Sequence, residues 1–151
     1  MHVEKDFEDL LRLFKKHKVK YCIVGAYAVA FYAKPRYTKD LDLFVKPDLN
    51  NSRRVIQALN EFGFLSLKLS EDTFAKPHTI IQLGFEPVRI DILTSLSGVP
   101  FDSAWKHRKR AAYGALKVMF IGKADLIKNK KASKRTQDLA DLEFLVKKSK
   151  S

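Results

Sequence analysis

Two aspartates in one short apolar strand are the feature that most limits how this chain can fold. In residues 38–45, Asp40 and Asp42 alternate with Leu41 and Leu43. Because side chains of a β-strand alternate between its faces, Asp40 and Asp42 share one face. Leu41 and Leu43 then point to the other face, toward a core. Two carboxylates this close repel each other. The pattern predicts either an exposed edge strand or a site at which a cation offsets the charge.

A third acid, Asp91, lies in a later strand-like segment that is otherwise largely apolar, residues 88–93. On a strand beside Asp40 and Asp42, it would complete a set of three carboxylates. Such oxygens suit hard divalent cations, Mg²⁺ or Mn²⁺, and three acids can bridge two metals. Asp91 would then serve as ligand, general base, or both. The alternative is that Asp91 forms an ion pair with Arg89 at the end of its strand.

The segment before the acids has features that suit a phosphate group. Gly25 and Ala26 stand between a predicted strand and a predicted helix. Backbone amides at a helix N-terminus attract anions, and glycine allows close approach. A plain tight turn is the alternative. Arg36 would neutralise a phosphate and Thr38 would donate a hydroxyl to it, unless they are a surface arginine and a strand-forming threonine.

Aromatic side chains also flank this segment, including Tyr27 and Phe31. They would either stack on a nucleic-acid base or, given their helical spacing, lie in the core.

Periodicity and turn residues predict an α/β or α+β protein in which helices flank a mixed sheet. The predicted helices are residues 4–17, 26–33, about 48–62, 102–105, 124–130 and 136–148. The predicted strands are residues 20–24, 38–45, 64–69, 79–84, 88–93 and 116–121. We expect a single domain over residues 1–146 and a basic tail over 147–151, without repeats or a linker.

Charge and composition narrow the class of protein. The net charge of +12, from 29 basic and 17 acidic residues, favours either a nucleic-acid partner or simply solubility with phosphate binding. The single cysteine, Cys22, argues against a disulfide scaffold and a zinc site. No apolar run reaches the roughly 18 residues of a membrane span, and no signal peptide is evident. We therefore expect a cytoplasmic protein with no membrane association.

Taken together, these residues resemble the nucleotidyltransferase superfamily, the fold of DNA polymerase beta and kanamycin nucleotidyltransferase. The sequence is most similar to small members related to the AbiEii toxins. The resemblance spans roughly residues 20–146. Its first half is carried by the run Gly25-Ala26, Arg36-x-Thr38-x-Asp40-Leu41-Asp42 and Asp91. Its second half is carried by Asp125-Leu126-Ile127-Lys128-Asn129-Lys130, Arg135, Asp138 and Asp141.

The resemblance implies transfer of a nucleoside monophosphate from a nucleoside triphosphate, such as ATP, to an acceptor. Asp40 and Asp42 would bind both metals, and Asp91 would bind the catalytic one and help to deprotonate the acceptor. Gly25 and Ala26 would hold the β- and γ-phosphates.

The later motif residues would complete the triphosphate site. Lys130 would contact the triphosphate, with Lys128 in its place if the register slips. Arg135 is a weaker candidate. Asp138 and Asp141 would be structural, through capping or ion pairs.

Several alternatives stay open at this stage. Ala26 stands where relatives have serine or glycine, which removes one phosphate contact and admits a nucleotide- or RNA-binding regulatory module without turnover. The acceptor would be RNA such as tRNA, a protein hydroxyl or a small molecule. The chain would also suit the toxin of a toxin–antitoxin pair. Because many relatives carry a further helical domain, an antitoxin or second subunit would complete the acceptor site. A phosphatase or nuclease is disfavoured by Gly25 and Lys130.

Overall fold

The computed structural model describes residues 3–33, 39–64, 68–85 and 88–150. Two residues predicted to bind phosphate, Arg36 and Thr38, lie outside these ranges, so their roles stay predictions.

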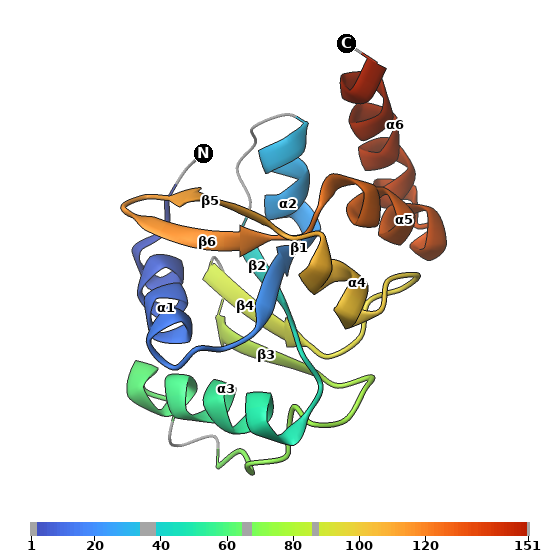
Figure 1. Cartoon of the computed structure of the whole chain (residues 1–151). Helices are drawn as coiled ribbons and strands as arrows, with labels where there is room; N and C mark the ends of the chain where they lie inside the picture. Colours follow the sequence, from blue (N-terminus) through green and yellow to red (C-terminus); the bar gives the residue numbers. More distant parts are fainter. Residues whose placement is uncertain (1–2, 34–38, 65–67, 86–87, 151) are drawn as a thin grey trace.

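A six-stranded mixed sheet forms the centre of the molecule (Figure 1). The strands are β1 (Tyr21–Val24), β2 (Asp40–Val45), β3 (Ile80–Phe85), β4 (Val88–Leu93), β5 (Lys109–Tyr113) and β6 (Leu116–Phe120). Their order in the sheet is β3-β4-β2-β1-β6-β5. The β2–β4 and β1–β6 pairs are parallel, and the other three pairs are antiparallel. The predicted mixed sheet with flanking helices is confirmed.

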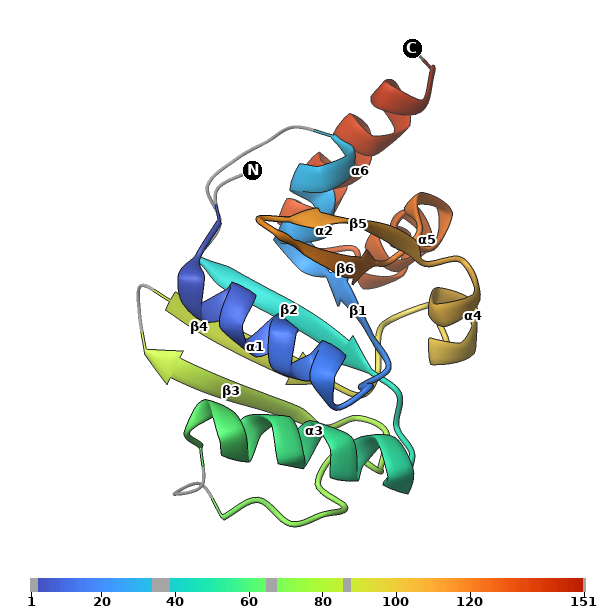
Figure 2. The ribbon, with the colours of Figure 1, turned by 60° about the vertical axis from the view of Figure 1, so that its left-hand side comes forward.

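Six helices surround the sheet. They are α1 (Lys5–Lys16), α2 (Gly25–Tyr32), α3 (Leu49–Phe62), α4 (Phe101–Lys106), α5 (Lys123–Ser133) and α6 (Thr136–Lys150). Figures 1 and 2 both show α1 and α3 together on one side of the molecule, while α2, α5 and α6 gather at the other. Residues 147–150 continue the α6 helix. Among the described residues, no helix is both long and apolar enough to cross a membrane.

Local sequence explains most of these boundaries. The predicted apolar face of α1, formed by Phe7, Leu10, Leu11 and Phe14, is fully buried. The Asp48 side chain caps α3 by accepting a hydrogen bond from the Asn51 amide, 2.7 Å away. Gly63 ends the same helix at a φ of +116°.

Two predictions of secondary structure were wrong. The strand over residues 64–69 is absent from the described part of that segment, where 64, 68 and 69 are not in a strand. Strand β5 was not predicted, because Lys-Arg-Ala-Ala-Tyr has no β-branched residue and exposes its two charged side chains. Pairing with β6 across the turn at Gly114 makes it a strand.

Two aromatic residues of α2, Tyr27 and Phe31, pack in or against the core. Tyr27 packs edge-on against Phe7 and Tyr113, with ring centroids 5.7 and 5.9 Å away. Phe31 stacks on Phe120 at 4.3 Å. The core alternative from the sequence is therefore confirmed for Tyr27 and Phe31.

Candidate active site

The sheet brings the three predicted aspartates together. Strands β2 and β4 run parallel with Asp42 opposite Asp91 and Asp40 opposite Arg89. On the other side of β2, Asp42 lies opposite Val24, the last residue of β1. Leu41 is buried, whereas Asp40 and Asp42 are partly exposed, as strand alternation requires.

Arg89 joins two of these acids. Its Nη2 donates to Asp40 Oδ2 at 2.9 Å, and its Nε lies 3.3 Å from Asp91 Oδ1. The side chain is about a third exposed, at 31%. The ion pair between Arg89 and Asp91, which the sequence left as an alternative, is thus present. It coexists with the acidic cluster, because one guanidinium contacts two carboxylates.

This arrangement makes ionisation of the Asp42 carboxyl group unfavourable. Burial, together with the neighbouring charges of Asp91 and Asp40, raises the pKa of its carboxyl from 3.8 to about 7, while Arg89 opposes the shift. Asp40 Oδ1 and Asp91 Oδ1 are buried and accept no hydrogen bond from any described residue. The cluster therefore has more negative charge than Arg89 neutralises.

These acids are a suitable donor set for a hard divalent cation, since all ligands are carboxylate oxygens and two of those oxygens lack a hydrogen-bond donor. As arranged, however, no three His, Cys, Asp or Glu side chains of the described residues form a group that would hold a metal ion. Arg89 bridges Asp40 and Asp91, so a cation between them requires the guanidinium to move.

Gly25 sits directly against Asp42 where β1 turns into α2. Its φ of +68° lies in the left-handed region. A Cβ atom at this position would overlap Asp42 Oδ2. The turn therefore needs glycine for both its backbone conformation and the space it leaves. It also sets the N-terminus of α2 beside the acids, where backbone amides favour anions.

We expect Gly25→Ala to impair the site more than the fold. The positive φ costs about 1–2 kcal/mol of stability. Displacement of Asp42 by about 1 Å would lower activity about 100-fold. Gly63→Ala is the matched control, because Gly63 also has a positive φ but a Cβ there meets no atom within 4 Å. Thermal unfolding and activity measurements distinguish the variants. Equal activity of the two would contradict the assigned role of Gly25.

A cleft of about 680 Å³ opens in front of these residues. Its wall combines Asp42 and Asp91, but not Asp40, with the ends of β3 and β4 and with α5 and the turn into α6. The lining includes Gly25, Asp42, Asp91, Arg89, Gln82, Ile80, Asn129, Lys130, Ser133 and Arg135. One cleft thus holds carboxylates, a helix N-terminus and arginine side chains.

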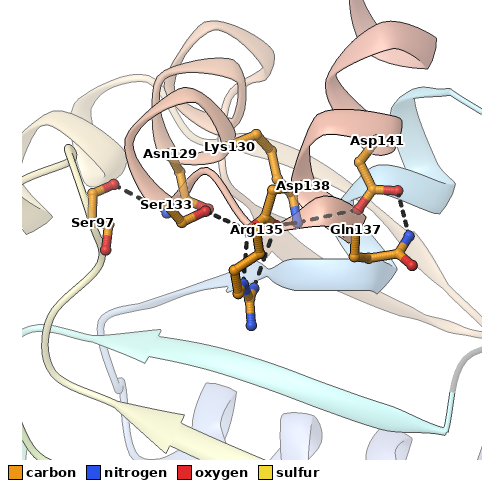
Figure 3. Close-up of polar contacts among 8 residues, drawn as sticks. All are labelled: Ser97, Asn129, Lys130, Ser133, Arg135, Gln137, Asp138 and Asp141. Atoms are coloured by element: carbon orange, nitrogen blue, oxygen red, sulfur yellow. Dashed lines mark hydrogen bonds and ion pairs between the residues drawn. The ribbon is translucent and has the colours of Figure 1, made fainter.

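Lys130, which the sequence predicts to contact the triphosphate, forms ion pairs inside the protein. Its Nζ lies 2.9 Å from Asp138 Oδ1 and 3.3 Å from Asp141 Oδ2 (Figure 3). Its side chain is only 5% exposed. The alternative, Lys128, is exposed but does not line the cleft. Both aspartates have the ion-pairing contacts expected of structural residues.

Arg135 is the more accessible cation of this region. Asp138 orients it by accepting hydrogen bonds from Nε at 2.7 Å and Nη2 at 3.3 Å, yet the side chain stays 74% exposed. Figure 3 shows it pointing from the helices toward the strands. Hydrogen bonding and attraction to Asp138 raise its pKa, and Asp42 contributes to that shift. Arg135, the weaker candidate from sequence, is better placed for a ligand than Lys130.

The cleft continues into two neighbouring hollows of about 440 and 510 Å³. Ser95 and Leu96 line the cleft and both hollows. The two additional hollows are lined by His78, Thr79, Ile80, Ser97, Gly98, Val99, Pro100, Phe101, Thr94, Pro77, Pro47 and Phe44, besides Ser95 and Leu96. We call their joint surface the uncharged groove, because no Lys, Arg, Asp or Glu that the structure describes lines it.

Sequence reasoning missed several residues of the cleft. It considered Arg89 only as an alternative partner of Asp91, although its position two residues before Asp91 on a strand already predicts a shared face. Gln82 pairs with Asp91 across β3 and β4. No sequence signal indicated Ser133, which lies in the cleft only because α5 ends there.

Neither a known family model nor a curated protein sequence matches the chain. Among the solved structures that match its fold is the lincosamide antibiotic adenylyltransferase LnuA bound to lincomycin. It has 18% sequence identity and a TM-score of 0.58 over 95% of this chain and 96% of the other. A Thermotoga maritima protein provisionally assigned as a nucleotidyltransferase matches with 14% identity and a TM-score of 0.56, over 93% and 88% of the two chains. The chain therefore has the fold of the nucleotidyltransferase superfamily.

Proposed function

We propose that this protein is a metal-dependent nucleotidyltransferase that moves a nucleoside monophosphate from a nucleoside triphosphate to an acceptor hydroxyl. One observation carries the proposal. Asp42 and Asp91 are register partners on parallel strands, and Gly25 places the N-terminus of α2 against Asp42 in the same cleft. This arrangement would allow general-base, cation-binding and phosphate-binding groups to surround one reacting phosphorus.

The three aspartates would have different roles in the reaction. Asp40, Asp42 and Asp91 would hold a divalent cation, Mg²⁺ or Mn²⁺, which when bound neutralises charge on the transferred phosphoryl group. Asp91 would accept the proton of the acceptor hydroxyl. The bond from acceptor oxygen to the α-phosphorus forms as the bond from that phosphorus to the bridging oxygen breaks, and pyrophosphate leaves. Arg89 would release Asp40 and Asp91 in the loaded site.

The phosphates of the donor would lie against α2 and Arg135. Backbone amides of Gly25 and Ala26 offer hydrogen bonds and the positive end of the helix dipole, although Ala26 supplies no hydroxyl. Arg135 would contact the leaving pyrophosphate. We propose that Lys130 acts through Asp138, which orients Arg135.

The uncharged groove supports a small or neutral acceptor. A chain with a net charge of +12 has no charged residue in this lining, whereas an RNA backbone would favour cations there. The similar structure of LnuA, an enzyme that adenylylates a lincosamide, spans nearly the same length. We therefore place a hydroxyl-bearing small molecule ahead of tRNA or a protein as acceptor. The toxin role and an antitoxin partner remain sequence predictions.

The test is label transfer. The protein is incubated with each α-labelled nucleoside triphosphate, Mg²⁺ or Mn²⁺, and either a small-molecule extract, total RNA or total protein. Label is expected in a small-molecule product, with pyrophosphate released. Label in RNA or protein would reject the proposed acceptor. Nucleotide binding without transfer to any fraction would instead favour the non-catalytic binding module, which the missing hydroxyl at Ala26 makes the second candidate.

We expect Arg135→Gln to raise the KM for the nucleoside triphosphate about tenfold with little change in kcat, because it removes a charge-assisted contact to phosphate. Arg12→Gln is the matched control, since Arg12 is also an exposed arginine with an acidic partner nearby in sequence, Glu8 at 3.6 Å. Steady-state kinetics in the donor nucleotide measure both. An equal KM for the two variants would remove Arg135 from the triphosphate site.

A further inference from the structure

A second concave site lies at the opposite end of β1 from the aspartates. Val24 ends β1 at the catalytic cleft, and Tyr21 begins the strand at this second site. The hollow has a volume of about 320 Å³. Its apolar wall is formed by Phe14, Val19, Tyr21, Trp105 and Met119. None of these residues lines the catalytic cleft, so the two sites are separate.

Six basic side chains complete the lining, to which no acidic residue of the described ranges belongs. They are Lys15, Lys18, Lys20, Arg54, Arg110 and Lys117. They come from the end of α1, the loop before β1, and the elements α3, β5 and β6. The nearby acid Glu61 is already paired with Lys16 and His17, at 2.9 and 2.8 Å. The hollow is therefore strongly positive around an apolar centre.

Parts of this surface are held in a fixed arrangement. The Arg108 guanidinium lies 3.7 Å from the centroid of the Trp105 ring, and Phe101 stacks near that ring at 6.1 Å with 20° between planes. Arg54 Nη1 donates to the Lys18 carbonyl at 3.3 Å, which ties α3 to the loop before β1. The site is thus preorganised around an aromatic side chain, which lowers the cost of ordering on binding.

We propose that this hollow, the basic–aromatic site, binds single-stranded RNA. An unstacked base enters the apolar hollow against Met119 and the part of Trp105 that lines it, since Arg108 already lies over that ring, and the flanking phosphates contact the surrounding lysines and arginines. Base contact with aromatic side chains and phosphate contact with cations are the two components of single-strand binding. The inference is independent of the proposed transferase activity, because it uses no residue of the catalytic cleft.

The combination of features favours this ligand over other anions. Six cations exceed what the phosphate of one mononucleotide needs, which indicates a polyanion. A concave apolar centre suits a splayed base, whereas duplex bases are stacked and unavailable. An anionic membrane is a flat surface and would leave the hollow unfilled. Membrane binding and acidic-peptide binding are therefore outcomes that the test must separate.

Trp105 provides a direct probe, because it is the only tryptophan in the chain. Titration with a short oligouridine is expected to change Trp105 fluorescence, and anisotropy of the labelled oligonucleotide measures affinity. Arg110→Ala combined with Lys117→Ala should weaken binding at least tenfold. It should also reduce the slope of log affinity against log salt by about 1.4, at roughly 0.7 per phosphate contact. Both side chains are exposed on β5 and β6, so folding should be retained.

The control variant also removes two positive charges, but outside the hollow. Lys131→Ala combined with Lys147→Ala changes exposed lysines of α5 and α6 outside the hollow. Equal losses in both double variants would show diffuse attraction and overturn the site. Oligouridine binding without a Trp105 signal would overturn it too. Tighter binding to anionic lipid vesicles or to polyglutamate than to oligouridine would reject RNA as the ligand. Loss of label transfer in Asp42→Asn with RNA binding retained would separate this site from the catalytic one.

Discussion

Replacing Asp42 by asparagine is expected to abolish nucleotidyl transfer and, at about pH 8 without divalent metal, to stabilise the fold. The loss of transfer should be roughly 1,000-fold or more, because a cation-binding carboxylate is removed from the reacting centre. The gain in stability should be on the order of 2–4 kcal/mol, since a buried carboxylate facing Asp91 no longer has to ionise. Activity assays and thermal unfolding measure the two effects on the same samples.

The pH dependence follows from the direction of the pKa shift. Burial and the charges of Asp91 and Asp40 raise the Asp42 pKa from 3.8 to about 7, so between these values the folded protein binds a proton that the unfolded chain has released. Stability attributable to this group therefore falls as pH rises from about 4 to 7 and stays low above 7. Asp42→Asn should flatten this part of the profile.

A divalent cation provides the complementary measurement. Mg²⁺ should raise the Tm of the wild type at about pH 8 and leave that of Asp42→Asn nearly unchanged. Asp102→Asn is the control, because Asp102 is exposed in the first turn of α4 outside the cleft. If Asp42→Asn destabilised the protein at this pH, or retained transfer, the electrostatic account of the site would be wrong.

Removing the Asp138 carboxylate is expected to cost about 3–5 kcal/mol of unfolding free energy, the usual result of leaving a buried charge without its partner. Lys130 is 4% exposed and Asp138 is fully buried. In Asp138→Ala, Lys130 keeps only its contact with Asp141, and Arg135 loses the carboxylate that orients it. Because α5 packs on α6 through this cluster, we expect denaturation at a lower urea concentration and a higher KM for the nucleoside triphosphate.

The double variant Lys130→Met with Asp138→Ala separates charge from packing. Removing both members should recover part of the stability lost in Asp138→Ala, because no unpaired lysine stays buried. Although burial opposes ionisation, hydrogen bonds from Arg135, Ser133 and Lys130 hold the Asp138 pKa below its usual range. Its stabilising contribution is therefore present above about pH 4 and lost as pH falls below that. Urea titrations that gave additive losses would show that the ion pair is not coupled.

The acidic motif shows which features of the fold and the site can be predicted from the sequence. Alternation in one strand established that Asp40 and Asp42 share a face, since that depends only on local backbone geometry. The same local rules located α1 by its apolar spacing and predicted α3 at about residues 48–62. They failed at β5, whose strand character comes from pairing with β6 and not from its own residues.

Tertiary structure decided which residues meet. The distance along the chain between Asp42 and Asp91 carries no information about their pairing, which follows from the parallel register of β2 and β4. The tertiary structure also showed which of two cations of the downstream motif is accessible to a ligand. Lys130 forms ion pairs with Asp138 and Asp141, whereas Arg135 is exposed and lines the cleft. Sequence alone determined the residue types and faces of the acids, because these are local properties. Their common site, the ion pair between Arg89 and Asp40, and the accessible cation depend on contacts between distant segments, which only the folded chain specifies.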